Sequence, residues 1–316
     1  MRRLLGWLEV ALRVAAVALA VLALLAVIAL VRVAPIDVRG LARQNPGRSA
    51  VMREREREAR EQGVGYSEWR QWVPLERVAA TLRGAVLVAE DDKFFSHDGL
   101  DWNEIRRSAQ RDLRAHHVVR GGSTITQQLA KNLWLGSART PWRKFEEMIL
   151  AVRLEHALSK RRILELYLNT IEWGPGVYGI DAAARHWFGV GAGSLTANQA
   201  VRLAAVIINP RRFSPVEPDA RIERRIQVIA GRLRRRGAIS EEEYRVTLGL
   251  PPEAETPAID SSLFARPEAA APAEPEPPAG GGPGGGAGGG AGEEEPGEGR
   301  PIAPDSAAAD TLGALR

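Results

Sequence analysis

An uninterrupted apolar run near the N-terminus limits most what this chain can fold into. Residues 14–31 are all Val, Ala, Leu or Ile, and apolar character extends back through residues 4–12. The run approaches the length of about 20 residues that a helix needs to cross a membrane. A cleaved signal peptide is the alternative, but the apolar core is long and no clear A-x-A site follows it. Because Arg2, Arg3 and Arg13 precede the run, the positive-inside rule predicts a signal anchor with a cytoplasmic N-terminus and the rest of the chain outside the cytoplasm.

Composition divides the rest of the chain into three parts. Arg and Glu alternate in the segment 36–68, which predicts a solvated spacer helix beside the membrane. Trp69 and Trp72 introduce a globular part, and these rings suit either the lipid interface or the core. From residue 251 on, Pro, Ala, Glu and Gly dominate, so the chain there has too little apolar surface to offset the entropy of ordering. We therefore expect an anchor in residues 1–35, a charged linker in 36–68, one domain in 69–250 and a disordered tail in 251–316.

Apolar residues are spaced as in helices nearly throughout the domain. Strand-like alternation is almost absent, so the sequence predicts a mainly α fold. Helix starts are indicated by Thr140 before Pro141, by Ser159, and by the capping pairs Thr196 with Gln199 and Ser240 with Glu243. The residues predicted to be buried are Val78, Leu82 and Val86 in a helix from Pro74, Phe145, Ile149 and Val152 after Thr140, and Ile163, Leu164, Leu166 and Leu168 after Ser159.

Several kinds of function are not supported by the motifs. Residues 174–179 match G-x-G-x-x-G by spacing, but they follow a predicted helix rather than a strand, so we expect a tight turn and no dinucleotide site. The phosphate-loop pattern G-x-x-x-x-G-K-[ST] is absent. The chain has no cysteine, which excludes disulfides and thiolate metal sites. Its formal charge of +4 suggests an acidic partner. No basic patch with interleaved aromatic residues indicates nucleic acid.

The stretch 121–132, Gly-Gly-Ser-Thr-Ile-Thr-Gln-Gln-Leu-Ala-Lys-Asn, combines an ordinary apolar face with an unusual polar face. Thr124 and Gln127 have the spacing of a capping box, which predicts a helix start. Thr124, Gln128 and Lys131 then place a hydroxyl, an amide and a cation together on one face. A simple cap and a solvated lysine would explain the same residues, so the stretch is a candidate site wall only through its neighbours. Three apolar residues four apart are expected to be buried: Ile125, Leu129 and Leu133.

An acidic cluster follows the apolar helix before it. Glu90, Asp91 and Asp92 lie where the core meets solvent, and there desolvation and like-charged neighbours raise a carboxyl pKa toward the useful range for a general base. His97 is a candidate ligand or base. A hydrogen-bonded structural histidine is the simpler interpretation, because no second histidine has metal-ligand spacing.

A second acid, Glu147, lies three residues after Lys144 and on the same predicted helix face. A surface ion pair would have the same spacing and would contribute only about 0.5 kcal/mol. A set of cations near these carboxylates suits a polyanionic substrate whose departing group must be neutralised. These cations are Lys131, Arg139, Arg143 and Lys144.

Four segments together resemble the ordered motifs of the family 51 glycosyltransferases, the peptidoglycan glycosyltransferases. They cover roughly residues 69–235, and the anchor with a single catalytic domain resembles the monofunctional biosynthetic form. The resemblance implies a lysozyme-like α-helical fold with a smaller, membrane-facing lobe. The segments are Glu90-Asp-x-x-Phe94-x-x-His97-x-Gly99, Gly122-Ser-Thr-x-Thr-Gln-Gln-x-x-Lys131-Asn132, Arg143-Lys144-x-x-Glu147 and Ile163-Leu-Glu-x-Tyr-Leu-Asn169.

The resemblance also implies an activity and residue roles. Lipid II would be polymerised into β-1,4 glycan strands at the outer face of a bacterial inner membrane, with undecaprenyl diphosphate leaving. Glu90 would be the base that removes a proton from the acceptor sugar's 4-hydroxyl. Lys131 and Arg139 would neutralise the donor's diphosphate, and Glu147, the second catalytic carboxylate, would organise that basic site. The remaining implied substrate-binding positions are Ser123, Thr124, Gln127, Gln128, Lys144, Asp91, Phe94, His97 and Asn132.

Cofactors and partners are less constrained. We expect no required cofactor, although relatives often respond to magnesium and a divalent cation therefore stays open. The expected partners are lipid II, the nascent glycan strand and the plasma membrane, with cell-wall synthesis or division proteins left open. The polar segment 99–121 lacks a clear apolar period and is expected to be mobile before substrate binds.

Two other functions remain alternatives. A peptidoglycan-cleaving glycosidase or lytic transglycosylase on the same fold would use Glu90 as a general acid. It would have no use for Lys131 and Arg139, because its leaving group is neutral. A non-catalytic, membrane-anchored scaffold is the second alternative, but it leaves the acidic and cationic motifs unexplained.

Overall fold

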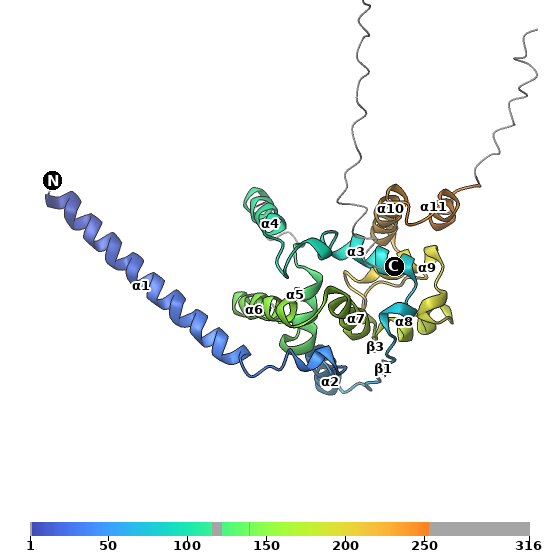
Figure 1. The fold of residues 1–316 in the computed structure, drawn as a ribbon, viewed down its shortest axis with the longest axis horizontal. Coiled ribbons are helices and arrows are strands. Elements are labelled where there is room, and N and C mark those ends of the chain that lie inside the picture. The colour runs from blue at the N-terminus through green and yellow to red at the C-terminus, as the bar shows by residue number, and fades with distance from the viewer. Residues whose placement is uncertain (1, 116–121, 139, 253–316) are drawn as a thin grey trace, which may run out of the picture. The chain divides into compact units, whose positions relative to one another are not determined.

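The computed structural model describes residues 2–115, 122–138 and 140–252. The predicted disordered tail lies outside these ranges from residue 253 on, as does Arg139. The described chain is mainly α-helical, as predicted (Figure 1). Its helices are α1 (Arg2–Val33), α2 (Ala50–Glu61), α3 (Ala80–Glu90), α4 (Trp102–Ala115), α5 (Ile125–Ala130), α6 (Pro141–Ala157), α7 (Lys160–Thr170), α8 (Ile180–Phe188), α9 (Ala197–Val206), α10 (Ala220–Arg235) and α11 (Glu241–Leu248). Short helical turns are η1 (Gly40–Ala42), η2 (Leu75–Arg77), η3 (Phe94–Ser96), η4 (Lys131–Leu135) and η5 (Ala192–Ser194).

Helix α1 contains a segment that is long and apolar enough to cross a membrane. Residues Leu12–Val33 have a mean hydropathy of 3.2, and only 6% of the most apolar window is buried, which fits an anchor better than a core helix. The end of α1 is attached to α6. Arg32 Nε donates to Glu146 Oε1 at 2.7 Å. The guanidinium of Arg153 donates to the carbonyl oxygens of residues 33, 34 and 36. These hydrogen bonds satisfy carbonyl groups at and beyond the end of α1.

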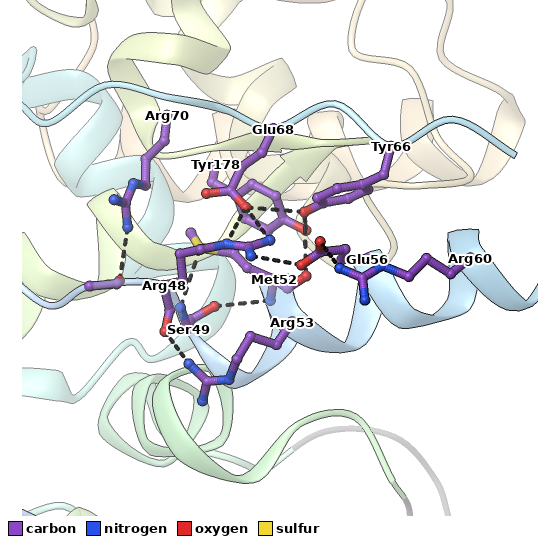
Figure 2. Close-up of polar contacts among 11 residues, drawn as sticks. Arg48, Ser49, Met52, Arg53, Glu56, Arg60, Tyr66, Glu68, Arg70 and Tyr178 are labelled. Carbon is purple, nitrogen blue, oxygen red and sulfur yellow. Dashed lines mark hydrogen bonds and ion pairs between the residues drawn. The ribbon is translucent and has the colours of Figure 1, made fainter.

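The charged segment 36–68 contains a helix, as predicted, but this helix is not solvated on all sides. This helix is α2, whose N-terminus is capped by Ser49 and whose Val51 and Met52 are buried in a cluster with Tyr178. The alternating charges pair around this buried side. Arg48, for example, donates to Glu56 and is paired with Glu68 (Figure 2). A charge pattern by itself does not show that one side of the helix is covered.

Helix α3 is the centre of the core, and Figure 1 shows it beside α9 and α10. Its residues 82–88 are buried. The helix predicted from Pro74 is in fact two elements, because Val78 is extended (φ −94°, ψ 132°) between η2 and α3. The predicted apolar face is nevertheless confirmed, since Val78, Leu82 and Val86 are buried.

A second group of helices packs around α5, which contacts α6 and α7. The predicted buried residues of α7 are confirmed. The face predicted for α6 is wrong, because Phe145 is 39% exposed while Ile149 and Val152 are half-buried. The buried face instead includes Glu146, Glu147, Leu150, Ala151 and Leu154. The carboxylates of Glu146 and Glu147 can be buried because each has a cationic partner. The spacing of apolar residues does not predict such partners.

Three short strands, from residues 69–70 and 172–178, form a small sheet. Its strand order is β1 (Trp69–Arg70), β3 (Val177–Tyr178) and β2 (Glu172–Gly174), with β1 parallel and β2 antiparallel to β3. The tight turn expected in residues 174–179 is confirmed as the β2–β3 connection. Gly176 has φ +74°, and a Cβ there would lie 2.4 Å from the carbonyl oxygen of Ser67. Part of the polar segment 99–121 is α4, a helix that its weak apolar period did not predict.

Candidate active site

Glu90 is the last residue of α3, so the central helix brings its carboxylate to the edge of the core. The side chain is 12% exposed. Its Oε1 accepts from Arg225 of α10 at 2.5 Å, and its Oε2 accepts from Gln128 Nε2 of α5 at 2.9 Å. Burial raises the pKa of Glu90 above its ordinary value, while Arg225 and Gln128 oppose that shift. The site therefore combines desolvation with partners for the charged form, which suits a general base.

The loop after Glu90 is held from within the protein. Asp91 accepts from the backbone N–H of Ile125 at 3.0 Å and from His97 Nε2 at 3.0 Å. His97 Nδ1 in turn accepts from the N–H of Gly99 at 3.2 Å, so the proton of the neutral ring lies on Nε2. Phe94 is fully buried. Asp91 and His97 pair with each other and Phe94 is buried, so all three shape this loop, and their predicted contact with substrate stays a prediction.

The start of α5 confirms the predicted capping box. Thr124 Oγ1 accepts from the N–H of Gln127, whose Oε1 accepts from the N–H of Thr124. Thr124 Oγ1 also donates to the carbonyl oxygen of Gly99 at 2.7 Å, which ties α5 to the Glu90 loop. Thr124, Gln127 and Asn132 are buried, and Asn132 donates to the carbonyl oxygen of Gln128, so all three support this helix, and their predicted contact with substrate stays a prediction. The predicted apolar stripe is confirmed: Ile125, Leu129 and Leu133 are buried.

Lys131 begins a π-helical turn, η4, that the sequence did not predict. Such a turn shifts the helix faces and is frequent at functional sites. Among the residues that the structure describes, the half-buried ammonium of Lys131 has no hydrogen-bond partner. Burial lowers the pKa of Lys131, while the negative charges of Glu147 and Glu90 raise it. A half-buried ammonium without a hydrogen-bond partner among the described residues can receive an anion.

Glu147 organises a cationic group at the start of α6. Its carboxylate accepts from both Arg143 and Lys144, and its side chain is only 3% exposed. Because Glu147 is buried and pairs with two cations, the interpretation as a simple surface ion pair is wrong. Lys144 Nζ also donates to Ser123 Oγ at 2.8 Å, which joins α6 to the residue just before α5. The structure thus brings Ser123, Lys144 and Glu147 together as predicted, whereas Arg139 lies outside the described residues.

No magnesium site is evident near these groups. Within residues 2–115, 122–138 and 140–252, no cluster of three or more His, Asp or Glu side chains is placed to hold a metal ion. Both oxygens of Glu147 already accept from cationic side chains. Glu147 is therefore committed to these two cations and has no oxygen left open for a metal ion.

Sequence reasoning missed two residues that act on Glu90. Arg225 is one of many arginines in residues 221–236, and nothing in their spacing distinguishes it. Tyr167 lies in the fourth motif, which carried no assigned role. Its buried hydroxyl donates to Gln128 Oε1 at 3.0 Å and so directs the Gln128 amide nitrogen toward Glu90. Only the three-dimensional packing of α3, α5, α7 and α10 reveals this set.

Comparisons with known proteins agree with this geometry. The transglycosylase family model matches residues 56–234, which include the whole site. The chain belongs to the transglycosylase family. A biosynthetic peptidoglycan transglycosylase of Methylobacillus flagellatus is 45% identical over 190 residues, which are 60% of this chain and 83% of the relative. Proteins of the same name from Nitrosospira multiformis (42% identical; 60% and 82% covered) and Bordetella pertussis (44%; 61% and 81%) are also similar.

This membership confirms the family resemblance seen in the motifs. It also identifies the chain as an enzyme, a glycosyltransferase, and so removes the non-catalytic scaffold as the primary function. In this transglycosylase Glu90 ends α3, which contacts α10, and the cations around Glu147 lie on α6, which contacts α5.

Proposed function

We propose that this enzyme polymerises lipid II into β-1,4-linked glycan strands, releases undecaprenyl diphosphate and has no transpeptidase activity. The observation that supports this proposal is the ammonium of Lys131, which has no hydrogen-bond partner among the described residues and interacts electrostatically with both Glu147 and Glu90. A cation in that place has a use if a diphosphate departs nearby. The relatives' names support the substrate class. The sequence contains neither Ser-x-x-Lys nor Lys-Thr-Gly, the motifs of a penicillin-binding domain.

Glu90 acts as the general base in this reaction. Its carboxylate takes the proton of the acceptor sugar's 4-hydroxyl while that oxygen bonds to the donor's anomeric carbon. The bond between that carbon and the diphosphate oxygen breaks, and the diphosphate takes the bonding electrons. Arg225 and Gln128 stabilise the charged carboxylate, as a base requires. A catalytic acid, in contrast, needs surroundings that favour the protonated form.

The leaving diphosphate is neutralised by Lys131 and Arg139, and Lys144 and Ser123 line the same side. Glu147 keeps Arg143 and Lys144 in place, because its buried carboxylate accepts from both. Fixed cations that meet charge as it develops are among the largest contributions to catalysis. The step needs no cofactor, since base and counter-charges come from side chains. A rate that does not change when magnesium is titrated would agree with this.

The anchor places the site at the membrane surface. Helix α1 spans the bilayer with its N-terminus in the cytoplasm, and the catalytic domain lies in the periplasm. Arg32 and Arg153 attach α6 to the end of α1, so the cationic site stays close to the surface from which a lipid-linked donor is presented. Cysteine labelling from either side of intact cells tests this orientation.

The test compares Lys131→Ala with Glu90→Gln on two substrates, lipid II and preformed glycan. Removal of one such charge or donor typically lowers the rate about 100- to 1000-fold, so each variant should lose nearly all polymerisation. Lys93→Ala is the matched control, because Lys93 is exposed and distant in sequence from the cationic group. If Lys131→Ala keeps full activity on lipid II, the assignment is wrong. Cleavage of preformed glycan that survives Lys131→Ala but not Glu90→Gln would identify the hydrolytic alternative.

A further inference from the structure

Helix α2, which precedes the domain predicted from the sequence, contacts the loop that follows Lys131. Glu54 of α2 accepts two hydrogen bonds from Ser137, one from the backbone N–H at 2.8 Å and one from Oγ at 2.7 Å. Gly136, with φ +75°, ends the π-helical turn that starts at Lys131. A Cβ at Gly136 would lie 3.0 Å from Glu54 Oε2, so the carboxylate is pressed directly against this loop.

The loop between η4 and α6 joins the two cationic parts of the site. The N–H of Gly136 donates to the carbonyl oxygen of Lys131 at 2.9 Å, which closes the π-helical turn. On the other side, Arg143 Nε donates to the carbonyl oxygen of Ala138, and the same Arg143 pairs with Glu147. Three consecutive residues, 136–138, are therefore held by Lys131, by α2 and by α6. The position of this loop therefore determines where Lys131 lies relative to Glu147 and its cationic partners.

Helix α2 is itself held in place by packing and ion pairs, so it can fix the position of the loop. Its Met52 is 1% exposed and packs with Tyr178 of β3. Arg55 is paired with the buried Glu172 of β2 at 3.2 Å. Figure 2 shows a further polar network at the start of α2. In it Arg48 is paired with Glu56 and Glu68, Arg53 donates to the carbonyl oxygen of Arg48, Arg70 donates to that of Gly47, and the hydroxyls of Tyr66 and Tyr178 are hydrogen-bonded.

We propose that Glu54 is a positioning residue of the glycosyl-transfer site, and that α2 holds the loop 136–138 so that Lys131 and the Glu147 group meet the same anionic leaving group. This inference rests on the proposed function. The family match begins at residue 56, so Glu54 lies outside the matched segment. The residue acts through Ser137 and touches no substrate.

The experiment uses the full-length, detergent-solubilised enzyme and labelled lipid II. Glu54→Ala should lower kcat/KM by about tenfold, mainly through kcat, because a misplacement of about 1 Å in a catalytic group lowers rates by up to about 100-fold. Glu54→Gln keeps one acceptor oxygen and should recover part of the loss. Glu61→Ala is the matched control on the same helix, since among the described residues Glu61 has only a long, exposed pair with Arg57. It should behave as wild type.

A second measurement makes the result independent of activity. Hydrogen exchange of the peptide 131–138 should become faster in Glu54→Ala, because the Ser137 amide loses its acceptor, and should not change in Glu61→Ala. The double variant Glu54→Ala, Ser137→Ala should be no slower than Glu54→Ala alone, if both act through one contact.

Three outcomes are distinguishable. The positioning role is supported if wild type and Glu61→Ala polymerise equally well while Glu54→Ala has a reduced kcat and an unchanged melting temperature. A wild-type kcat in Glu54→Ala overturns the positioning role. So does a loss of activity in Glu54→Ala and Glu54→Gln that is fully explained by a smaller fraction of folded protein. If wild type makes no polymer, the proposed function fails, while the exchange measurement still decides whether Glu54 holds the loop.

Discussion

Replacement of Arg225 by methionine tests how the protein keeps Glu90 ready to accept a proton. The variant removes the guanidinium that contacts the Glu90 carboxylate at 2.5 Å and leaves an uncharged side chain of similar length. Burial persists, so the charged carboxylate loses its strongest counter-charge and the pKa of Glu90 rises further. An opposite charge at such a distance lowers a carboxyl pKa by about 1–3 units. The acid limb of the kcat/KM profile should therefore move upward by about 1–3 pH units, because a base works only when deprotonated.

Initial rates of lipid II polymerisation, measured across the pH range in which circular dichroism shows a folded protein, give this profile. Arg232→Met is the matched control. Arg232 lies on the same helix and donates to the carbonyl oxygen of Val88 in α3 without contacting Glu90, so its acid limb should stay at the wild-type pH. Arg225→Lys keeps a cation and should move the limb less than Arg225→Met. An acid limb that does not move in Arg225→Met would refute the reasoning. An alkaline limb that moves upward would indicate that Glu90 works as an acid.

Three further changes test the packing and the site. Tyr167→Phe removes the hydroxyl that orients Gln128 and should slow polymerisation several-fold with little loss of stability, as initial rates and thermal melting will show; an unchanged rate would mean that Gln128 needs no such support. Gly176→Ala forces a Cβ against Ser67 at a positive φ and should destabilise the fold by more than about 1 kcal/mol in urea unfolding, and wild-type stability would contradict the turn geometry. Met52→Ala removes a buried side chain from α2 and should lower the free energy of unfolding by about 2–5 kcal/mol, which a solvated α2 would not show.

Local signals in the sequence predicted local structure well. The capping boxes at Thr124, Thr196 and Ser240 are all present, because each depends on residues three apart in the chain. The spacing of Lys144 and Glu147 predicted their pairing, and the family resemblance implied that Ser123 belongs to the same site. Such short spacings can be read directly from the sequence.

Features that depend on distant segments were not predictable. The charges of α2 do not reveal that Met52 is buried, and the arginines of α10 do not reveal that Arg225 alone contacts Glu90 among them. The π-helical turn at Lys131 arises where α5 meets the loop held by Glu54, and no propensity signals it. Phe94 and His97 belong to one motif by sequence, and only the structure shows that Phe94 is buried and that His97 pairs with Asp91.

The most direct test of the central claim is incubation of the solubilised protein with labelled lipid II beside Glu90→Gln, followed by separation of products by size. We expect long polymer that lysozyme digests from wild type, and none from Glu90→Gln. The same polymer from Glu90→Gln would contradict the assignment of the base. Cleavage of preformed glycan without polymer from wild type would contradict the polymerase and favour the hydrolytic alternative.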